Sequence, residues 1–114
     1  MGADIEARNK MGRTPILNAV FSRRPDLVTV SALIDLGANV NVRSRKNQYS
    51  PLHYAAEKGQ VEIVRKLVAS GANIHAVTDF GQKALELSEK SAPNYHAIAD
   101  ILRQEERRTK IGEQ

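Results

Sequence analysis

The chain contains no cysteine and no tryptophan, and it has few aromatic residues of any kind. Without cysteine, disulfide bonds, thiolate metal sites and cysteine nucleophiles are excluded. The core must be built from Ala, Leu, Ile and Val, which suits closely packed helices. No apolar run approaches the roughly 20 residues of a membrane span, and Asp4 and Glu6 stand where a signal peptide would be apolar. We therefore expect an intracellular protein of the cytoplasm, with the nucleus as the alternative, and no membrane contact.

What the chain does contain is the composition of a soluble globular protein, with 41% hydrophobic and 26% charged residues. Its 114 residues make one small domain, near the lower limit at which apolar burial outweighs conformational entropy. Lys and Arg number 17 against 13 Asp and Glu, a formal net charge of +4. This charge slightly favours an acidic partner, but it lacks the clustering expected of a nucleic-acid binder.

Two short segments recur along the chain at a nearly constant spacing, which indicates internal repeats. A glycine-led segment occurs three times, at residues 2–6 (GADIE), 37–41 (GANVN) and 71–75 (GANIH). A second segment recurs in step with it, at residues 14–17 (TPIL), 50–53 (SPLH) and, more weakly, 83–86 (KALE). The spacings lie between 33 and 36 residues, so the chain holds about three copies of one unit.

The middle unit predicts two helices followed by a polar loop. Ser50 and Pro51 supply an N-cap and a first-turn proline for the first helix, and Gly59 ends it in the position that tolerates positive φ. Residues 61–68 carry an apolar stripe at helical period, and Gly71 stops this second helix.

This pattern resembles the ankyrin repeat, through residues 50–56 (SPLHYAA), Gly59, residues 62–64 (EIV) and residues 71–74 (GANI). The resemblance covers about residues 2 to 104. It implies an all-α repeat fold, an ankyrin-type solenoid of stacked antiparallel helix pairs with β-hairpin loops projecting at right angles. The expected single domain, residues 1–114, divides into an incoming hairpin arm (2–11), repeat 1 (12–44), repeat 2 (45–77), a C-terminal capping repeat (78–104) and a helical extension or frayed tail (105–114).

Several residues depart from the family pattern. Leu17 stands where the family has histidine. The loop around residues 45–48 has one extra residue and no tip glycine, so we expect it to stand out and be mobile. Lys83 and Ala84 replace the Thr-Pro pair, and Ser88 is one of the polar residues that replace paired alanines, which is typical of a capping repeat.

The N-terminal flank is the least complete part of the pattern. Residues 2–10 form the returning arm of a hairpin that lacks its own helix pair, and repeat 1 is too apolar for a polar cap. We expect this flank to pack on a missing repeat, on a partner or on a second copy.

The three histidines are the first candidates for chemistry, but each has a structural interpretation. In the ankyrin family the histidine at the place of His53 bonds to loop backbone and ties neighbouring repeats together. His75 replaces a hairpin asparagine, and His96 begins the last helix. The three lie in different parts of the stack, which argues against a metal site. Ser50 is explained as a helix cap, and the carboxylates are scattered, so we predict no enzymatic activity and no cofactor.

The resemblance places partner binding on the hairpin tips and the inner helices, which line one groove in the family. Large apolar groups and arginines are favoured at interface centres, and we expect Met11, Phe21, Tyr49 and Phe80 to be exposed, although Tyr49 and Phe80 have packing against the neighbouring hairpin as an alternative. The full set of predicted partner-binding residues is Met11, Arg13, Phe21, Arg45, Lys46, Tyr49, Glu57, Lys58, Phe80 and Gln82. The first two loops are basic through Arg8, Lys10, Arg13, Arg43, Arg45 and Lys46, which suggests an acidic patch on the partner or a merely solvated charged edge.

Three functions remain open from the sequence. The first is a non-catalytic protein-protein interaction module such as an adaptor. The second is a stand-alone inhibitor or immunity-type protein that blocks an enzyme or toxin. The third, a nucleic-acid binder, is the weakest, and it predicts a steep loss of affinity with salt.

Overall fold

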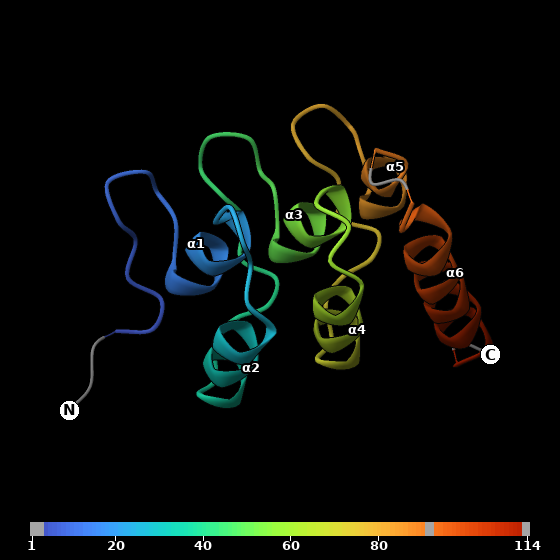
Figure 1. Cartoon of the computed structure of the whole chain (residues 1–114), viewed down its shortest axis with the longest axis horizontal. Coiled ribbons are helices and arrows are strands. Elements are labelled where there is room, and N and C mark those ends of the chain that lie inside the picture. Colours follow the sequence, from blue (N-terminus) through green and yellow to red (C-terminus); the bar gives the residue numbers. More distant parts are fainter. Residues whose placement is uncertain (1–3, 91–92, 113–114) are drawn as a thin grey trace.

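A computed structural model describes residues 4–90 and 93–112, with side chains up to residue 109. Six helices in these ranges form two rows (Figure 1). The inner row holds α1 (Pro15–Phe21), α3 (Pro51–Glu57) and α5 (Ala84–Ser88), and the outer row holds α2 (Leu27–Asp35), α4 (Val61–Ala69) and α6 (Tyr95–Gly112). The molecule measures 41 × 31 × 26 Å. The predicted stack of helix pairs is confirmed.

Three loops project from the same side of the stack, and we call them finger 1 (residues 7–13), finger 2 (42–49) and finger 3 (76–82). None of the described residues forms a β-strand, so the fingers are not the regular β-hairpins that the resemblance implied. A backbone hydrogen bond between the two sides of each finger closes it instead. The donors and acceptors are Asn9 N–H to Arg13 C=O at 2.9 Å, Ser44 N–H to Tyr49 C=O at 2.8 Å, and Thr78 N–H to Gln82 C=O at 3.0 Å.

The helix ends follow the capping residues of the sequence. Ser50 has extended backbone, with φ −93° and ψ 170°, and its hydroxyl accepts the N–H of His53 while Pro51 occupies the first turn of α3. Asp26 caps α2 by accepting the N–H of Val28 at 3.0 Å. Gly59, with φ 71°, makes the turn between α3 and α4.

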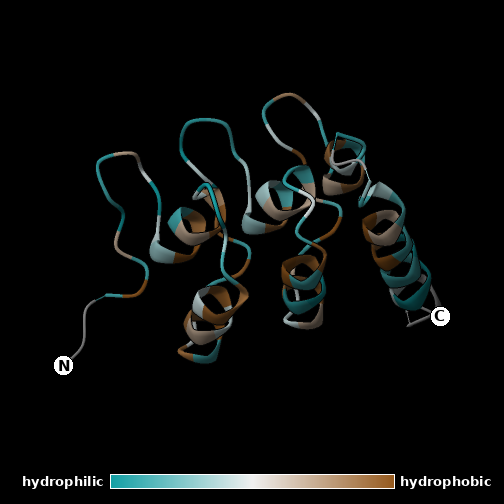
Figure 2. Cartoon of the chain, viewed as in Figure 1, coloured by the Kyte–Doolittle hydropathy of each residue, from teal (hydrophilic) through white to brown (hydrophobic). Residues whose placement is uncertain are grey.

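The core lies between the two rows and between successive repeats. Helix α1 packs on α3, α3 on α5, α2 on α4, and α4 on α6. Ala55 and Ala56 are fully buried, which lets the inner helices approach closely. Figure 2 shows apolar residues on helix faces turned toward other helices, and polar residues along most of the fingers. The fully buried side chains of largest volume include Ile16, Leu17, Leu52, Ile63, Leu67, Leu87 and Ile98.

Hydrogen bonds at equivalent positions connect each repeat to the next. The Glu6 carboxylate accepts the N–H of Asn39 at 2.7 Å. One repeat later, Asn41 Oδ1 accepts the N–H of Asn73 at 2.7 Å, and Asn41 Nδ2 donates to the Gly71 carbonyl at 3.2 Å. The stack is therefore held by polar bonds along its edge as well as by apolar packing.

The two ends of the chain differ in how much is described. The predicted incoming arm begins at residue 2, and residues 2 and 3 lie outside the described part. Helix α6 continues without a break through residue 104 to Gly112, and residues 113 and 114 of the predicted extension lie outside the described part. On the outer helix α2, Val28 is 74% exposed at a position where repeat 2 carries Glu62.

Candidate partner-binding surface

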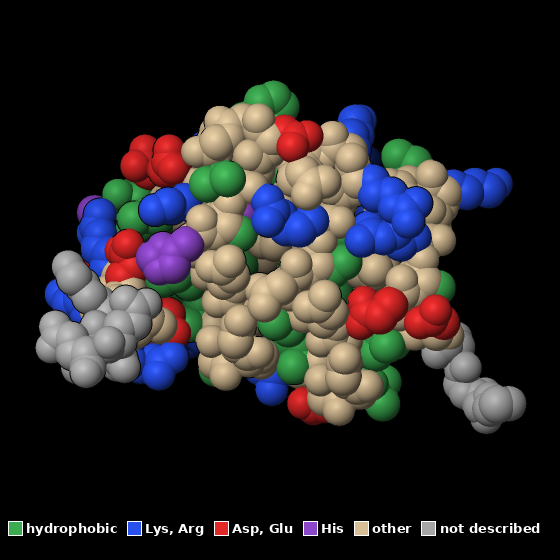
Figure 3. Space-filling view, turned by 180° about the vertical axis from the view of Figure 1, so that it is seen from behind, with side chains coloured by type: hydrophobic (Ala, Val, Ile, Leu, Met, Phe, Trp, Pro, Cys, Tyr) green, Lys and Arg blue, Asp and Glu red, His purple; other side chains and the backbone are tan. Residues whose placement is uncertain are grey.

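The fingers and the inner helices share one surface, which we call the inner surface. Among the predicted partner-binding residues, Met11 and Phe80 lie at finger tips with 56% and 75% of their surface exposed. Arg45 and Lys46 are exposed on finger 2, and Phe21, at the end of α1, is 41% exposed. In Figure 3, Lys and Arg side chains gather in the upper part of the molecule, where the fingers lie.

Phe21 is the centre of a small aromatic and cationic cluster. Its ring meets the ring of Tyr54 edge-on, with centroids 5.4 Å apart and planes at 82°, a favourable geometry for two aromatic rings. The guanidinium carbon of Arg13 lies 3.6 Å from the Phe21 centroid, and the ammonium of Lys58 lies 5.7 Å from it. The fold thus joins finger 1, α1 and the end of α3 at one place. We call Arg13, Phe21 and Lys58 the cation-aromatic cluster.

Our expectation that the Tyr49 ring is exposed was wrong. It is only 8% exposed, because its ring packs against Tyr54 with centroids 4.8 Å apart. Its hydroxyl donates to Glu57 Oε2 at 3.2 Å. Burial, with the Glu57 carboxylate beside the hydroxyl, raises the pKa of Tyr49 to about 12, so the phenol stays protonated as a donor. The ring is a structural anchor under finger 2, not an exposed contact.

The pairing of Tyr49 with Glu57 repeats the pairing of Arg13 with Phe21. In both repeats the residue after the finger tip reaches the residue eight positions later, at the end of the inner helix. Glu57 also meets Lys90, whose Nζ lies 3.7 Å from Glu57 Oε2. Phe21, Glu57 and Lys90 occupy equivalent positions in their repeats, so they form a row across the inner surface.

Two arginines that we assigned to a basic surface have a structural role. Arg8 donates to the carbonyl of Gly12 in its own finger at 2.6 Å and to the carbonyl of Arg43 in the next at 3.0 Å. Arg43 does the same one repeat later, donating to the carbonyls of Gln48 and Val77. Sequence reasoning missed this tether, although the same residue type recurring 35 positions apart was a visible signal.

Finger 2, which we expected to stand out, is tied to finger 3. The carbonyl of Asn47 at its tip accepts the N–H of Asp79 at 3.0 Å. Gln48 takes φ 60° and so fills the place that glycine holds in the other two fingers. The side chain of Gln48 donates to the Ser44 carbonyl at 3.2 Å, which helps a residue with a side chain to hold this conformation.

His53 is buried and tied into the stack. The N–H of Ser50 donates to Nδ1 at 3.0 Å, so the ring proton lies on Nε2, which contacts the carbonyls of Ala76 at 3.0 Å and Gln82 at 3.2 Å. Burial lowers the pKa of His53 from its ordinary value of 6.5. These bonds, together with the Ser50 hydroxyl 2.8 Å from Nδ1, engage both ring nitrogens and give His53 a structural role. His75 and His96 are exposed and separate, and no described group of three or more His, Asp or Glu residues could hold a metal.

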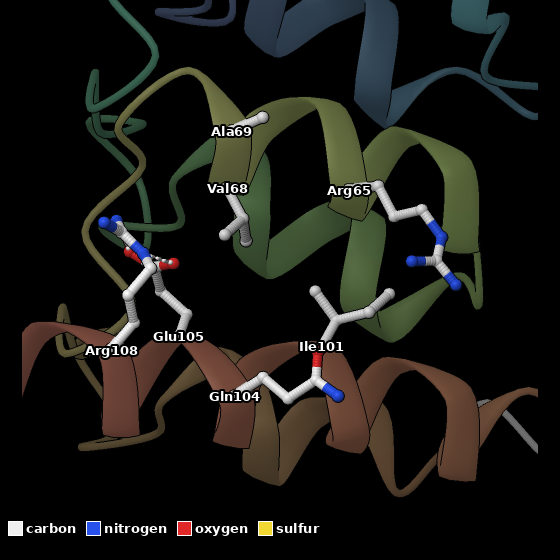
Figure 4. Close-up of a pocket in the computed structure, with 7 residues that line it drawn as sticks. All are labelled: Arg65, Val68, Ala69, Ile101, Gln104, Glu105 and Arg108. Carbon is white, nitrogen blue, oxygen red and sulfur yellow. Dashed lines mark hydrogen bonds and ion pairs between the residues drawn. The ribbon is translucent and has the colours of Figure 1, made fainter.

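The outer row carries a groove of about 320 Å³ between α4 and α6, drawn in Figure 4. Val68 and Ile101 form its apolar floor, and Arg108 binds Glu105 at its end with N–O 2.6 Å. That hydrogen bond lowers the pKa of the Glu105 carboxyl. The groove contains none of the predicted partner-binding residues. No helix in the described ranges has the length and apolar character needed to cross a membrane.

The comparisons with known proteins concern the repeats. A model of the ankyrin repeat family, described as three copies, matches residues 1–78. The chain is 42% identical over 89 residues to an Arabidopsis thaliana protein whose name assigns it to the E3 ubiquitin-protein ligases, covering 76% of this chain and 23% of that protein. It is 30% identical over 87 residues to the palmitoyltransferase AKR1 of Saccharomyces cerevisiae, covering 76% of this chain and 11% of that protein.

A solved structure supports the same similarity. The crystal structure of the ankyrin repeat domain of Bcl-3, described as a member of the IkappaB protein family, has a TM-score of 0.77 and 35% identity, covering 90% of this chain and 42% of that one. The chain spans less than a quarter of the two curated relatives. Because those relatives are named for unrelated reactions, the shared repeats assign neither reaction to this chain.

Proposed function

The chain belongs to the ankyrin repeat family, and from this we propose that it binds a partner protein through its fingers and inner helices and catalyses no reaction itself. Ankyrin repeats generally mediate protein-protein interaction. One observation supports the use of this surface here: Met11, Phe21 and Phe80 leave large apolar area exposed, and cationic side chains lie against the Phe21 ring. Such side chains are typical of interface centres.

The stack also favours binding on physical grounds. The fingers are fixed to each other by the Arg8 and Arg43 tethers and by the bond from Asp79 to Asn47. A surface that is already ordered loses little conformational entropy when a partner binds. Its exposed residues can also change without disturbing the core.

Site-specific photo-crosslinking tests the proposal. A photoreactive residue is placed at Phe80 on finger 3, or at the exposed Glu62 on α4 as a matched control on the outer row. In native extract, Phe80 should crosslink to a discrete protein that Glu62 does not reach. Crosslinking of that protein from Glu62 alone, or equally from both positions, would refute binding at the inner surface.

The captured protein then separates an adaptor from an inhibitor. If it is an enzyme, its turnover is measured with and without the purified chain. Unchanged turnover identifies an adaptor, and stoichiometric loss of turnover identifies an inhibitor. The Phe80→Ala variant, which alters an exposed side chain, serves as the control that removes binding without unfolding the chain.

A further inference from the structure

We infer that the cation-aromatic cluster recognises a carboxylate: the partner presents an Asp or Glu side chain there, flanked by apolar residues that meet the finger tips. This inference rests on the proposed function, because it names the chemistry of the partner at the same surface. It starts from the geometry of Arg13, whose guanidinium lies 3.6 Å from the Phe21 centroid.

Most cations of the inner surface lack acidic partners within the described residues, although Lys90 pairs with Glu57. The ion pairs among all the described residues use Arg65, Lys66, Lys90 and Arg108 as cations. The cations of the first two fingers and at the C-terminal end of α3 take part in no described ion pair. Arg8 and Arg43 bind backbone carbonyls, and the remaining ones are Lys10, Arg13, Arg45, Lys46 and Lys58. Like charges on one surface repel each other, and an incoming carboxylate relieves that repulsion.

The carboxylate that adjoins Lys58 in the chain is already engaged elsewhere. Glu57 already accepts the Tyr49 hydroxyl and pairs with Lys90. This pairing neutralises the inner surface toward repeat 3 and leaves the positive charge over repeats 1 and 2. The contact of Arg13 with the Phe21 ring holds the guanidinium in place, so less side-chain entropy is lost when a carboxylate binds.

The described contacts favour a protein carboxylate over a nucleic-acid phosphate. Phosphate sites commonly use free backbone N–H groups in loops, but Asn9 Oδ1 accepts those of Met11 and Arg13, and Thr78 Oγ1 accepts those of Phe80 and Gln82. Bases stack on open aromatic faces, whereas Arg13 lies over one face of the Phe21 ring and the Tyr54 ring packs against it at 82°.

Two exposed apolar side chains at finger tips of the inner surface complete the description of the partner. Met11 is 56% exposed and Phe80 is 75% exposed, on the first and third fingers. These groups fit apolar side chains of the partner on either side of its carboxylate. The inner surface therefore suits an acidic segment with interspersed large apolar residues.

Selection from a displayed library of random 12-residue peptides tests the inference. Peptides are selected on the intact chain and measured by fluorescence anisotropy against Arg13→Ala/Lys58→Ala. The matched control is Arg65→Ala/Arg103→Ala, which removes the same charge from exposed outer-row positions. We expect enrichment in Asp or Glu next to large apolar residues, and binding about tenfold weaker to the first double variant but unchanged for the control. Thermal melting checks that both variants fold.

The other outcomes separate this inference from the proposed function. Enriched peptides whose binding depends on Phe80 but which carry no acidic bias would refute carboxylate recognition by the cluster. They would leave the proposed protein binding intact. Peptides that bind every variant equally, or no enrichment at all, would overturn both. A fluorescent single-stranded DNA 20-mer is the last probe, and its salt-sensitive binding through Arg13 and Lys58 would replace the acidic segment with a nucleic acid.

Discussion

Replacement of His53 by Leu tests how the repeats are joined, because Leu17 already occupies the equivalent position in repeat 1. The change keeps an apolar side chain of similar size and removes the bonds from the ring. Four contacts disappear: those of the Ser50 N–H and the Ser50 hydroxyl with Nδ1, and those of Nε2 with the carbonyls of Ala76 and Gln82. A hydrogen bond contributes about 1 kcal/mol net, and a buried donor left without a partner costs about 1–3 kcal/mol. We expect the free energy of unfolding to fall by about 2–4 kcal/mol, from a total of roughly 5–15 kcal/mol.

Urea unfolding followed by circular dichroism measures this loss. With a slope of about 2 kcal/mol per molar urea, the middle of the usual range, the midpoint should fall by roughly 1–2 M. Amide hydrogen exchange shows where in the chain the stability is lost, because His53 joins repeat 2 to finger 3. Amides of α5 and α6 should lose more protection than those of α1, since repeats contact only their neighbours.

The pH dependence has a definite sign. The folded-state pKa of His53 lies below 6.5, so the unfolded chain takes up a proton first as the pH falls. The contribution of His53 is complete above pH 6.5 and is lost between pH 6.5 and the folded-state pKa. The stability difference between the intact chain and His53→Leu should therefore narrow below pH 6.5. A variant as stable as the intact chain, or a difference that stays constant with pH, would refute the reasoning.

Two further predictions concern the fingers. Tyr49→Ala removes a buried ring and should lower the free energy of unfolding by about 3–4 kcal/mol. Phe80→Ala should change it by less than about 0.5 kcal/mol because that ring is 75% exposed. Thermal melting measures both effects, and equal effects would contradict the burial of Tyr49. Arg43→Ala should cost about 1–2 kcal/mol because it removes the bonds to Gln48 and Val77, and the amides of finger 3 should exchange faster, whereas the exposed Lys46→Ala should leave both stability and exchange unchanged.

The expected exposure of the predicted partner-binding residues was met in part. Fingers and inner helices hold Met11, Phe21 and Phe80 as exposed groups, in line with the motif positions. The expected exposure of Tyr49 was wrong because Tyr54, on the inner helix α3 of the same repeat, offers an aromatic surface for packing. Gln82, predicted as a partner contact, uses its backbone to close finger 3 and to bind His53.

The sequence alone determined the period and the helix boundaries, because caps, prolines and glycines act within a few residues of where they stand. It also indicated His53 as a link between repeats through the resemblance of its motif. Only the tertiary structure decided that Arg13, Phe21 and Lys58 meet and that Arg8 and Arg43 bind carbonyls of the next finger. Except for Arg13 and Phe21, which are eight positions apart, these contacts join residues some 35 positions apart. They depend on how far one repeat is rotated and shifted against the next. No local pattern encodes that rotation, since it results from the packing of the whole stack.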